Sequence, residues 1–444
     1  MADFDDPVVD KIIAHLLRVA DGDIPEVART AARIFIADTL AVGIAGAQAP
    51  WRAEVLDMAK GAPAEATVWG GGGHLALAGA AMVNAFQVHS QEFDPVHEAA
   101  VVHPLAAVLA GALGWAERQG GVSGEALIRA VIAGADVAAT LGLCSRAPMR
   151  FFRPANCSGF GAVAALAMLA RLDEDQTRHA LGIYYGQCAG TMQAHIEGTP
   201  QLAMQMGFAA RSAVTAIELA RRGMPGPRAP ISGPFGYFAL FDGEATPAPF
   251  DQLGEVWRIA ELSHKPFPSG RATHGGIDGL QRLIAEHSVT ADRVTAGRFI
   301  VPPLTHRLVG RPPRNDMTVA YARLCLSYCG ALTLRRGAVG LGDFSGGALI
   351  DRETLALADR LAVIIDANPD PNALHPIRVE LDLTDVHTTA CDVTEVLGSP
   401  ARPLSPEAAR AKFAQCGASD ALWDAVMSLE TLDDAAVLAR FAAR

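Results

Sequence analysis

The segment Pro266-Phe267-Pro268-Ser269-Gly270 divides the sequence into two parts with different patterns. From residue 6 to about residue 240, apolar residues recur at spacings of three and four, and alanine-rich faces permit close helix packing. After the segment, Pro376-Ile377-Arg378-Val379-Glu380-Leu381-Asp382-Leu383 alternates apolar and polar residues with the period of a half-buried strand. The pattern predicts a helical part followed by a part that contains strands.

Individual elements follow from the same periodicities. Asp5 or Asp6 before Pro7 predicts the start of a first helix over 8–19, and Asp173 predicts another helix start. Beyond the dividing segment we expect strands at 298–301, 361–366 and 376–383, helices at 318–335 and 354–359, and helical periodicity again from 405 to 444. The expected fold is mainly α: an all-helical domain (1–265 and 400–444) with a smaller α/β lid domain (266–399).

Composition excludes several classes of protein. Of 444 residues, 50% are hydrophobic and only 19% are charged, so the chain is not disordered and buries a large core. The net charge of -11 does not favour binding to nucleic acid or to an anionic membrane, both of which are negatively charged. The almost wholly apolar stretches 105–115 and 130–143 predict central helices or an oligomer interface. We expect small-molecule ligands and a homodimer.

The cysteine pattern and the N-terminal residues indicate in which cellular compartment the protein is expected. Seven cysteines, none in a CxxC pair, argue against a disulfide framework and against a structural zinc site. The first seven residues are acidic and lack the basic and apolar regions of a signal peptide. We therefore expect a soluble cytoplasmic protein.

The densest polar cluster is His89-Ser90-Gln91-Glu92-Phe93-Asp94-Pro95-Val96-His97-Glu98, followed by His103-Pro104. Pro95 interrupts helical structure, which places the cluster on a connection between two buried helices. Neighbouring carboxylates and imidazoles shift one another's pKa, as general acid-base catalysis requires. The alternative is that the acids only cap backbone amides. Spacings of His89, His97 and His103 match no helical zinc-ligand pair, and we assign no metal.

A second candidate is the basic loop from Ser263 to Gly276, which contains Lys265, Arg271 and His274. Cationic side chains among small residues suit an anionic small molecule held between two domains. The alternative is a solvated hinge. Gly70–Gly73 and the Gly159-Phe160-Gly161 stretch lack the features of a P-loop or a dinucleotide-binding turn, so no nucleotide cofactor is indicated.

The order of several short motifs resembles the MmgE/PrpD family, which includes 2-methylcitrate dehydratase, cis-aconitate decarboxylase and iminodisuccinate epimerase. The motifs are Ala37-Asp38-Thr39-Leu40-Ala41-Val42, Val88-His89-Ser90-Gln91-Glu92-Phe93-Asp94 with His103-Pro104, Gly159-Phe160-Gly161-Ala162, Gly207-Phe208-Ala209-Ala210, Lys265-Pro266-Phe267-Pro268, Ala322-Arg323-Leu324-Cys325-Leu326-Ser327-Tyr328 and Asp343-Phe344.

This resemblance implies a homodimer without an organic cofactor, and an interdomain cleft for di- or tricarboxylates. It also implies chemistry that begins with removal of a proton next to a carboxylate. The candidate catalytic residues are His103, Lys265, His274 and Tyr328; the candidate substrate-binding residues are Glu92, Asp94, His97, Arg153 and Arg271.

Departures from the family pattern bear on the reaction. Pro95 and Val96 stand where relatives usually have an aspartate and a threonine, Arg153 replaces a histidine, and Gly270 replaces a cysteine. Groups that could protonate a leaving hydroxyl are therefore lost, whereas the candidate bases remain. Among the family's activities, epimerisation of iminodisuccinate is the closest match. The alternatives are a 2-methylcitrate-type dehydratase and a non-catalytic carboxylate-binding relative.

Overall fold

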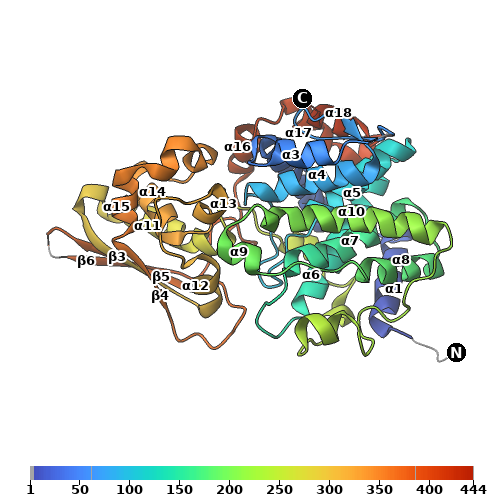
Figure 1. The fold of residues 1–444 in the computed structure, drawn as a ribbon, viewed down its shortest axis with the longest axis horizontal. Helices are drawn as coiled ribbons and strands as arrows, with labels where there is room; N and C mark the ends of the chain where they lie inside the picture. The colour runs from blue at the N-terminus through green and yellow to red at the C-terminus, as the bar shows by residue number, and fades with distance from the viewer. Residues whose placement is uncertain (1–4, 62, 386, 444) are drawn as a thin grey trace.

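The structure is a computed structural model that describes residues 5–61, 63–385 and 387–443. Helices dominate the larger part, here called the helical body, on the right of Figure 1. From the N-terminus its helices are α1 Pro7–Asp21, α2 Glu26–Ala45, α3 Arg52–Met58, α4 Leu77–Ser90, α5 Leu105–Gln119, α6 Gly124–Leu143, α7 Arg153–Leu169, α8 Glu174–Tyr185, α9 Gln193–Glu197 and α10 Gln201–Arg221. A two-stranded sheet of β1 (Ala66–Thr67) and β2 (His74–Leu75) lies beside them.

The small domain, on the left of Figure 1, is built on one four-stranded sheet. Its strands are β3 Val294–Val301, β4 Leu361–Ile365, β5 Ile377–Leu383 and β6 Thr388–Val393, in the order β4-β3-β5-β6. Only β3 and β4 are parallel. Its helices are α11 Arg271–His287, α12 Pro303–Val309, α13 Val319–Ala322, α14 Leu326–Arg336 and α15 Arg352–Ala358. The predicted mainly α fold with a smaller α/β part is confirmed.

Strand β5 shows which face of the sheet packs against α11. Alternate residues of β5, including Val379 and Leu381, are buried under α11, whereas Arg378 and Glu380 face the other side. That side is covered by ion pairs, among them Arg298 with Glu380 at 3.0 Å. The alternation in the sequence therefore corresponds to one core face and one polar face.

The prediction of one continuous helix over 318–335 is wrong. The segment forms two helices, α13 and α14, because backbone groups between them form hydrogen bonds with other segments. The carbonyl of Arg323 accepts a hydrogen bond from the Gly270 amide (3.0 Å), and Cys325 pairs with Gly310 in an isolated bridge. The break brings Arg323 to the junction between the two parts of the chain.

The capping predictions are confirmed at two helix starts. Asp6 accepts hydrogen bonds from the amides of Val8 and Val9, and Asp173 forms a capping box with Gln176. Asp6 also accepts from Ile231 and Ser232, which ties the first helix to a distant segment. A side chain expected to be a local cap is thus also a long-range contact.

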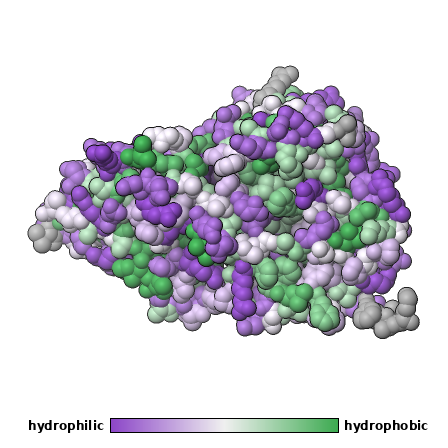
Figure 2. Space-filling view, in the orientation of Figure 1, coloured by the Kyte–Doolittle hydropathy of each residue, from purple (hydrophilic) through white to green (hydrophobic). Residues whose placement is uncertain are grey.

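In the described part of the chain, two helices are long and apolar enough to cross a membrane by length and composition, over Glu26–Gln48 and Gly124–Leu143. Within the chain, 67% and 83% of their apolar windows are buried, as in core helices of the body. On the face shown in Figure 2, hydrophilic side chains surround scattered hydrophobic patches. The stretches 105–115 and 130–143 fall in α5 and α6, which are buried against neighbouring helices of the same chain.

The C-terminal segment returns to the helical body through α16 (Pro406–Gln415), α17 (Asp420–Met427) and α18 (Val437–Ala442), at the top of Figure 1. Lys412 of α16 is buried, and its Nζ lies 2.7 Å from Asp38 of α2. The same Nζ donates to the Phe93 carbonyl at 2.8 Å. One cation therefore joins the C-terminal segment to the core and to the connection that follows α4.

We predict that Lys412→Met lowers the free energy of unfolding by about 3 kcal/mol, because it leaves the Asp38 carboxylate buried without its cation. Urea denaturation followed by circular dichroism measures the change. The matched control is Lys60→Met, which removes a pair with Asp57 whose side chains are 65% and 76% exposed. The control should leave the unfolding curve unchanged. Equal losses in the two variants would contradict the role of the buried pair.

Candidate active site

The connection from Gln91 to Pro104 carries the central groups of the candidate site. It begins where α4 ends at Ser90, and its residues Glu92 and Val101 adopt positive φ angles of 48° and 52°. This conformation is strained for a β-branched valine. Backbone bonds between His97 and Val102 (2.8 and 3.3 Å) hold the turn. The turn brings His103 back toward Asp94.

The Asp94 carboxylate is buried and shared by two imidazoles. One of its oxygens lies 3.1 Å from His89 Nδ1 and 3.0 Å from His103 Nδ1. The two rings are 4.7 Å apart between centroids and meet edge to face at 75°. Each ring thus has one nitrogen fixed by the same carboxylate.

The surrounding charges shift the pKa values of the two imidazoles in opposite directions. Burial alone would lower the pKa of His89, but Asp94 and Glu92 outweigh it and hold this pKa above its ordinary value. Burial lowers the pKa of His103, and the charges of Lys265 and His89 add to this, against the opposing effect of Asp94. Although burial opposes it, the two imidazoles keep the pKa of Asp94 well below its usual range. The arrangement favours a protonated His89 beside a neutral His103.

A second buried ion pair crosses from the connection to the basic loop. Lys265 Nζ, which is completely buried, lies 2.8 Å from Glu92 Oε2. Burial would raise the pKa of Glu92, but Lys265 and the two imidazoles lower it to about 2. Next to this pair the backbones of Val96 and Ser263 form an antiparallel bridge. The acidic connection and the basic loop are therefore in direct contact.

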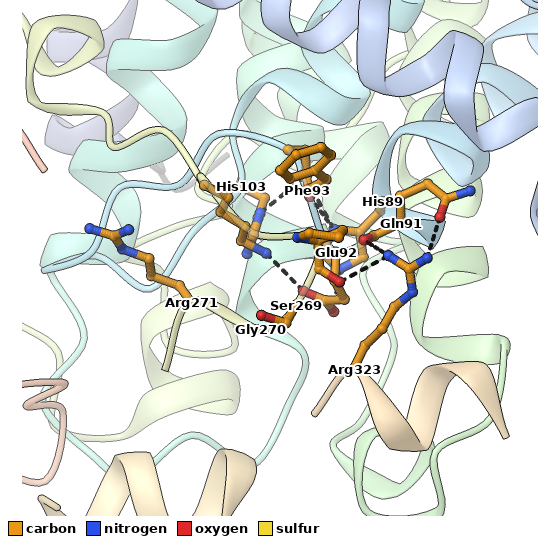
Figure 3. A network of polar contacts seen from close by, with 12 residues as sticks. His89, Gln91, Glu92, Phe93, His103, Ser269, Gly270, Arg271 and Arg323 are labelled. Carbon is orange, nitrogen blue, oxygen red and sulfur yellow. Dashed lines mark hydrogen bonds and ion pairs between the residues drawn. The ribbon is translucent and has the colours of Figure 1, made fainter. Parts of the chain in front are cut away.

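Arg323 and Glu98 form further hydrogen bonds between the acidic connection and the small domain. The Arg323 guanidinium donates to the Gln91 backbone and side-chain oxygens and to the Pro268 carbonyl at 3.0 Å. Figure 3 shows Arg323 pointing to Gln91 on one side of the network and Arg271 on the other. Glu98 accepts from Arg271 Nη2 at 2.8 Å and also bonds Ser263 and His375. Each of these bonds has a charged donor or a charged acceptor and is therefore charge-assisted.

A cavity of about 70 Å³ lies beside His89 and His103, large enough for several water molecules. Its wall is mainly apolar. The lining residues are His89, Glu92, Val96, Val101, His103, Met149, Phe152, Pro154, Met192, His195, Leu202, Arg271, Ala272, Leu308, Leu324 and Leu374. Residues of the helical body and of the small domain contribute to the same wall, so the cavity lies between the two parts.

A larger cleft of about 850 Å³ adjoins the smaller cavity. It is lined by Glu98, His97, His375 and residues of the 370–375 segment, and it shares Leu374 with the smaller cavity. Leu374 therefore separates the smaller cavity from the larger cleft, and Glu98 of the cleft pairs with Arg271 of the smaller cavity.

The structure places the predicted catalytic residues at different depths. His103 lines the cavity, and Lys265 lies behind Glu92. His274 is not in the cavity wall: its Nε2 lies 3.1 Å from the Ser269 carbonyl and its Nδ1 lies 3.3 Å from Arg271. Tyr328 lies in a separate hydrophobic cluster, where its hydroxyl bonds the Ala348 carbonyl at 2.8 Å.

The predicted substrate-binding residues also separate into groups. Glu92 and Arg271 line the cavity, and Asp94 holds its imidazoles from behind. His97 faces the larger cleft, with its Nε2 2.9 Å from Glu261. Arg153 is buried and donates to the Ala100 carbonyl and to Asn372, both at 3.3 Å.

Four residues of the site were not assigned to it from the sequence. His89 and Glu98 were visible in the polar cluster, whose density was the available signal. His195 and Arg323 have no comparable local signal, because a short helix and a helix break bring them to the site. Their recognition needed the tertiary structure.

The ligating atoms of His89, Asp94 and His103 lie within 4.8 Å of one another, the geometry of a possible cation site. Both Nδ1 atoms are nevertheless at hydrogen-bond distance from Asp94 itself. A cation bound to these atoms would have to replace both of these bonds. The observed arrangement fits an acid-base network better than a metal site.

Comparison with known proteins matches both parts of the chain. The MmgE/PrpD N-terminal domain matches residues 11–249, and the MmgE/PrpD C-terminal domain matches residues 267–421. The chain belongs to the MmgE/PrpD family. Among curated proteins it is similar to the cis-aconitate decarboxylase-like protein oryM of Aspergillus oryzae, with 25% identity over 457 residues, covering 94% of this chain and 93% of the relative. The expected family is thus confirmed, and members of this MmgE/PrpD family include enzymes.

We predict that Asp94→Asn lowers the pKa of both His89 and His103, because it removes the negative charge that favours their protonated forms. Titration of ¹⁵N-labelled histidine by NMR measures both values. In the wild type, His89 should titrate above and His103 below the ordinary value near 6.5. As a control, Asp385→Asn, an aspartate paired with Arg293, should leave both curves in place. Unchanged curves in Asp94→Asn would refute the shared-carboxylate arrangement.

Proposed function

We propose that this MmgE/PrpD protein is a cofactor-independent epimerase. It inverts the carbon next to a carboxylate in an amino or imino dicarboxylate, with iminodisuccinate as the named substrate. The reaction removes the α-proton and returns it to the opposite face, and no bond to a leaving group is broken. The proposal extends to this site the carbon-acid chemistry expected from the family resemblance.

The observation that carries the proposal is the orientation of His103. Its Nδ1 bonds the ionised Asp94, so the neutral ring carries its proton there and leaves the lone pair of Nε2 for a substrate. Among the described residues, Nε2 has no hydrogen-bond partner, and the side chain lines the cavity. A neutral imidazole held by a carboxylate is a suitable general base for an α-proton.

The protonation states expected for the acidic groups of the site favour return of the proton to carbon. Both carboxyl groups close to the bases, Glu92 and Asp94, are ionised at neutral pH because cations lower their pKa. Neither can protonate a departing hydroxide. His89 is the imidazole of the cavity wall whose pKa is raised, and we assign it the proton-return role in place of His274, which lies behind Arg271. Deprotonated and protonated imidazoles in one cavity are what a two-base exchange requires.

Arginine side chains support binding of the substrate carboxylates. Arg271 lines the cavity, although it also pairs with Glu98. Arg153 does not line the cavity, but its neighbours Phe152 and Pro154 do, and it has no acidic partner among the described residues. Guanidinium groups bind carboxylates with two parallel bonds. Their charges would also lower the cost of the second negative charge that develops when the α-proton leaves.

A lyase is the second candidate, and His89 is the observation that favours it. A protonated imidazole beside a neutral base can also protonate a leaving hydroxyl in a 2-methylcitrate-type dehydratase. The similarity to a cis-aconitate decarboxylase-like protein points to lyase chemistry as well. Ultraviolet absorbance distinguishes the two, because dehydration of methylcitrate creates a conjugated alkene and epimerisation creates none.

We predict that turnover of iminodisuccinate in deuterated water places solvent deuterium on the α-carbon of the inverted product. His103→Asn should reduce this exchange at least about 100-fold, because it removes the base. Mass spectrometry measures the label. The matched control is His179→Gln, which changes an imidazole bonded to the Gly226 backbone in the helical body. Inversion without label would exclude proton transfer, and binding without any turnover would favour a non-catalytic relative.

We further predict an acid limb in the pH profile of kcat/KM below the ordinary histidine pKa of 6.5. His103 works as a base only when neutral, and its lowered pKa keeps it neutral to lower pH. Activity should therefore fall as the pH decreases through the His103 pKa, and it should fall again only as the pH rises through the higher pKa of His89, where the proton-return group is lost. The midpoint of the acid limb should agree with the NMR titration of His103. An acid limb with its midpoint above pH 7 would be incompatible with His103 as the base.

A further inference from the structure

His195 is a cavity-lining imidazole that the preceding mechanism does not use. It lies on the short helix α9 and is buried, and it shares the cavity wall with His103, Glu92 and Arg271. The helical body supplies His195, whereas its hydrogen-bond partner, Arg311, belongs to the small domain. This contact is therefore another link across the junction at which the cavity lies.

Arg311 determines which nitrogen of His195 carries the proton. Its Nη2 lies 3.1 Å from His195 Nδ1 and donates to the carbonyl of the same residue at 2.8 Å. A guanidinium group has donors only, so Nδ1 must be the acceptor and the ring proton must be on Nε2. The tautomer is thus opposite to that of His103, whose Nδ1 faces a carboxylate.

The protonated Nε2 is left for the cavity. Among the described residues it has no hydrogen-bond partner, and the other edge of the ring is occupied by Arg311. Burial and the charges of Arg311 and Arg307 lower the pKa of His195 to about 3, against the opposing effect of Glu92. The ring is therefore a neutral donor over the physiological range, and with Nδ1 engaged it is not a base.

We propose that His195 is a catalytic residue whose Nε2–H binds a carboxylate oxygen of the substrate and stabilises the negative charge that develops there. The inference rests on the proposed proton removal by His103. As His103 Nε2 takes the α-proton, the C–H electron pair moves into the adjacent carboxylate and gives an aci-carboxylate with two negative oxygens. His195 keeps its proton throughout. A preformed donor in the mainly apolar wall of the cavity is most effective at such a position.

The test compares substitutions that keep or remove the donor at the Nε2 position. His195→Gln places an amide N–H near that position, whereas His195→Asn mimics only the Nδ1 edge and His195→Ala removes both. We expect His195→Ala and His195→Asn to lose about 100-fold or more in kcat for deuterium exchange, with a smaller change in KM, and His195→Gln to recover much of it. The acid limb assigned to His103 should remain in every variant.

The control is His179→Ala, a histidine of the helical body that bonds the Gly226 backbone and should leave kcat unchanged. Full activity of His195→Ala, or equal activity of the Asn and Gln variants, would overturn the proposal. A merely structural role would predict that the Gln variant fails like the Ala variant.

A second measurement does not depend on turnover. Two-bond ¹H–¹⁵N NMR correlations of the wild type should show a neutral Nε2–H tautomer for His195 between pH 5 and pH 8. Arg311→Met should allow the Nδ1–H tautomer to appear. Succinate binding by calorimetry should weaken in His195→Ala more than in His195→Gln. If no dicarboxylate exchanges deuterium but these results hold, the proposed reaction fails and the donor assignment stands; an Nδ1–H tautomer or an imidazolium in the wild type refutes the donor.

Discussion

The site depends on one buried negative charge, the Asp94 carboxylate. Removing this charge from water is costly unless cations or donors surround it, and two imidazoles supply them at 3.0 and 3.1 Å. The two rings cannot respond equally, because His89 also borders Glu92 whereas His103 feels the charge of Lys265. A single carboxylate therefore creates a neutral base and a protonated partner side by side, and the mechanism proposed here needs both.

The same electrostatic requirement joins the two parts of the chain. Lys265 bonds Glu92, Arg271 bonds Glu98, and Arg323 bonds Gln91 across the junction. Burial lowers the pKa of Arg323 to about 10, a sign of how little water reaches it. Charges buried in this way stabilise only when all partners are in place, so they make the relative position of the two parts specific. The cavity between them gains a fixed shape and a low-dielectric environment in which each donor acts strongly.

Predictions from the sequence were most accurate where local pattern decides the outcome. The alternation in 376–383 appears as β5, the caps at Asp6 and Asp173 are present, and the density of charge near Asp94 marked the connection that carries the site. Predictions were less accurate where a backbone group forms a hydrogen bond with a residue that is distant in the sequence. The expected helix over 318–335 is broken because the Arg323 carbonyl accepts a hydrogen bond from the Gly270 amide, which lies outside the helix. Tyr328 matched the family motif but lies in a separate cluster, and His274 supports Arg271 from behind the cavity wall.

The sequence by itself determined the fold class, the family and the two segments, near Asp94 and Lys265, that form the candidate site. These follow from periodicity, turn residues and motif order, which are properties of neighbours along the chain. Only the tertiary structure decided which side chains share the cavity and which nitrogen of each imidazole is free. Those choices depend on the partner that each ring meets: a carboxylate for His103 and a guanidinium for His195, each from a segment that the chain brings in from elsewhere. Because hydrogen bonding and burial act through space, the protonation states of these histidines cannot be derived from their positions in the sequence.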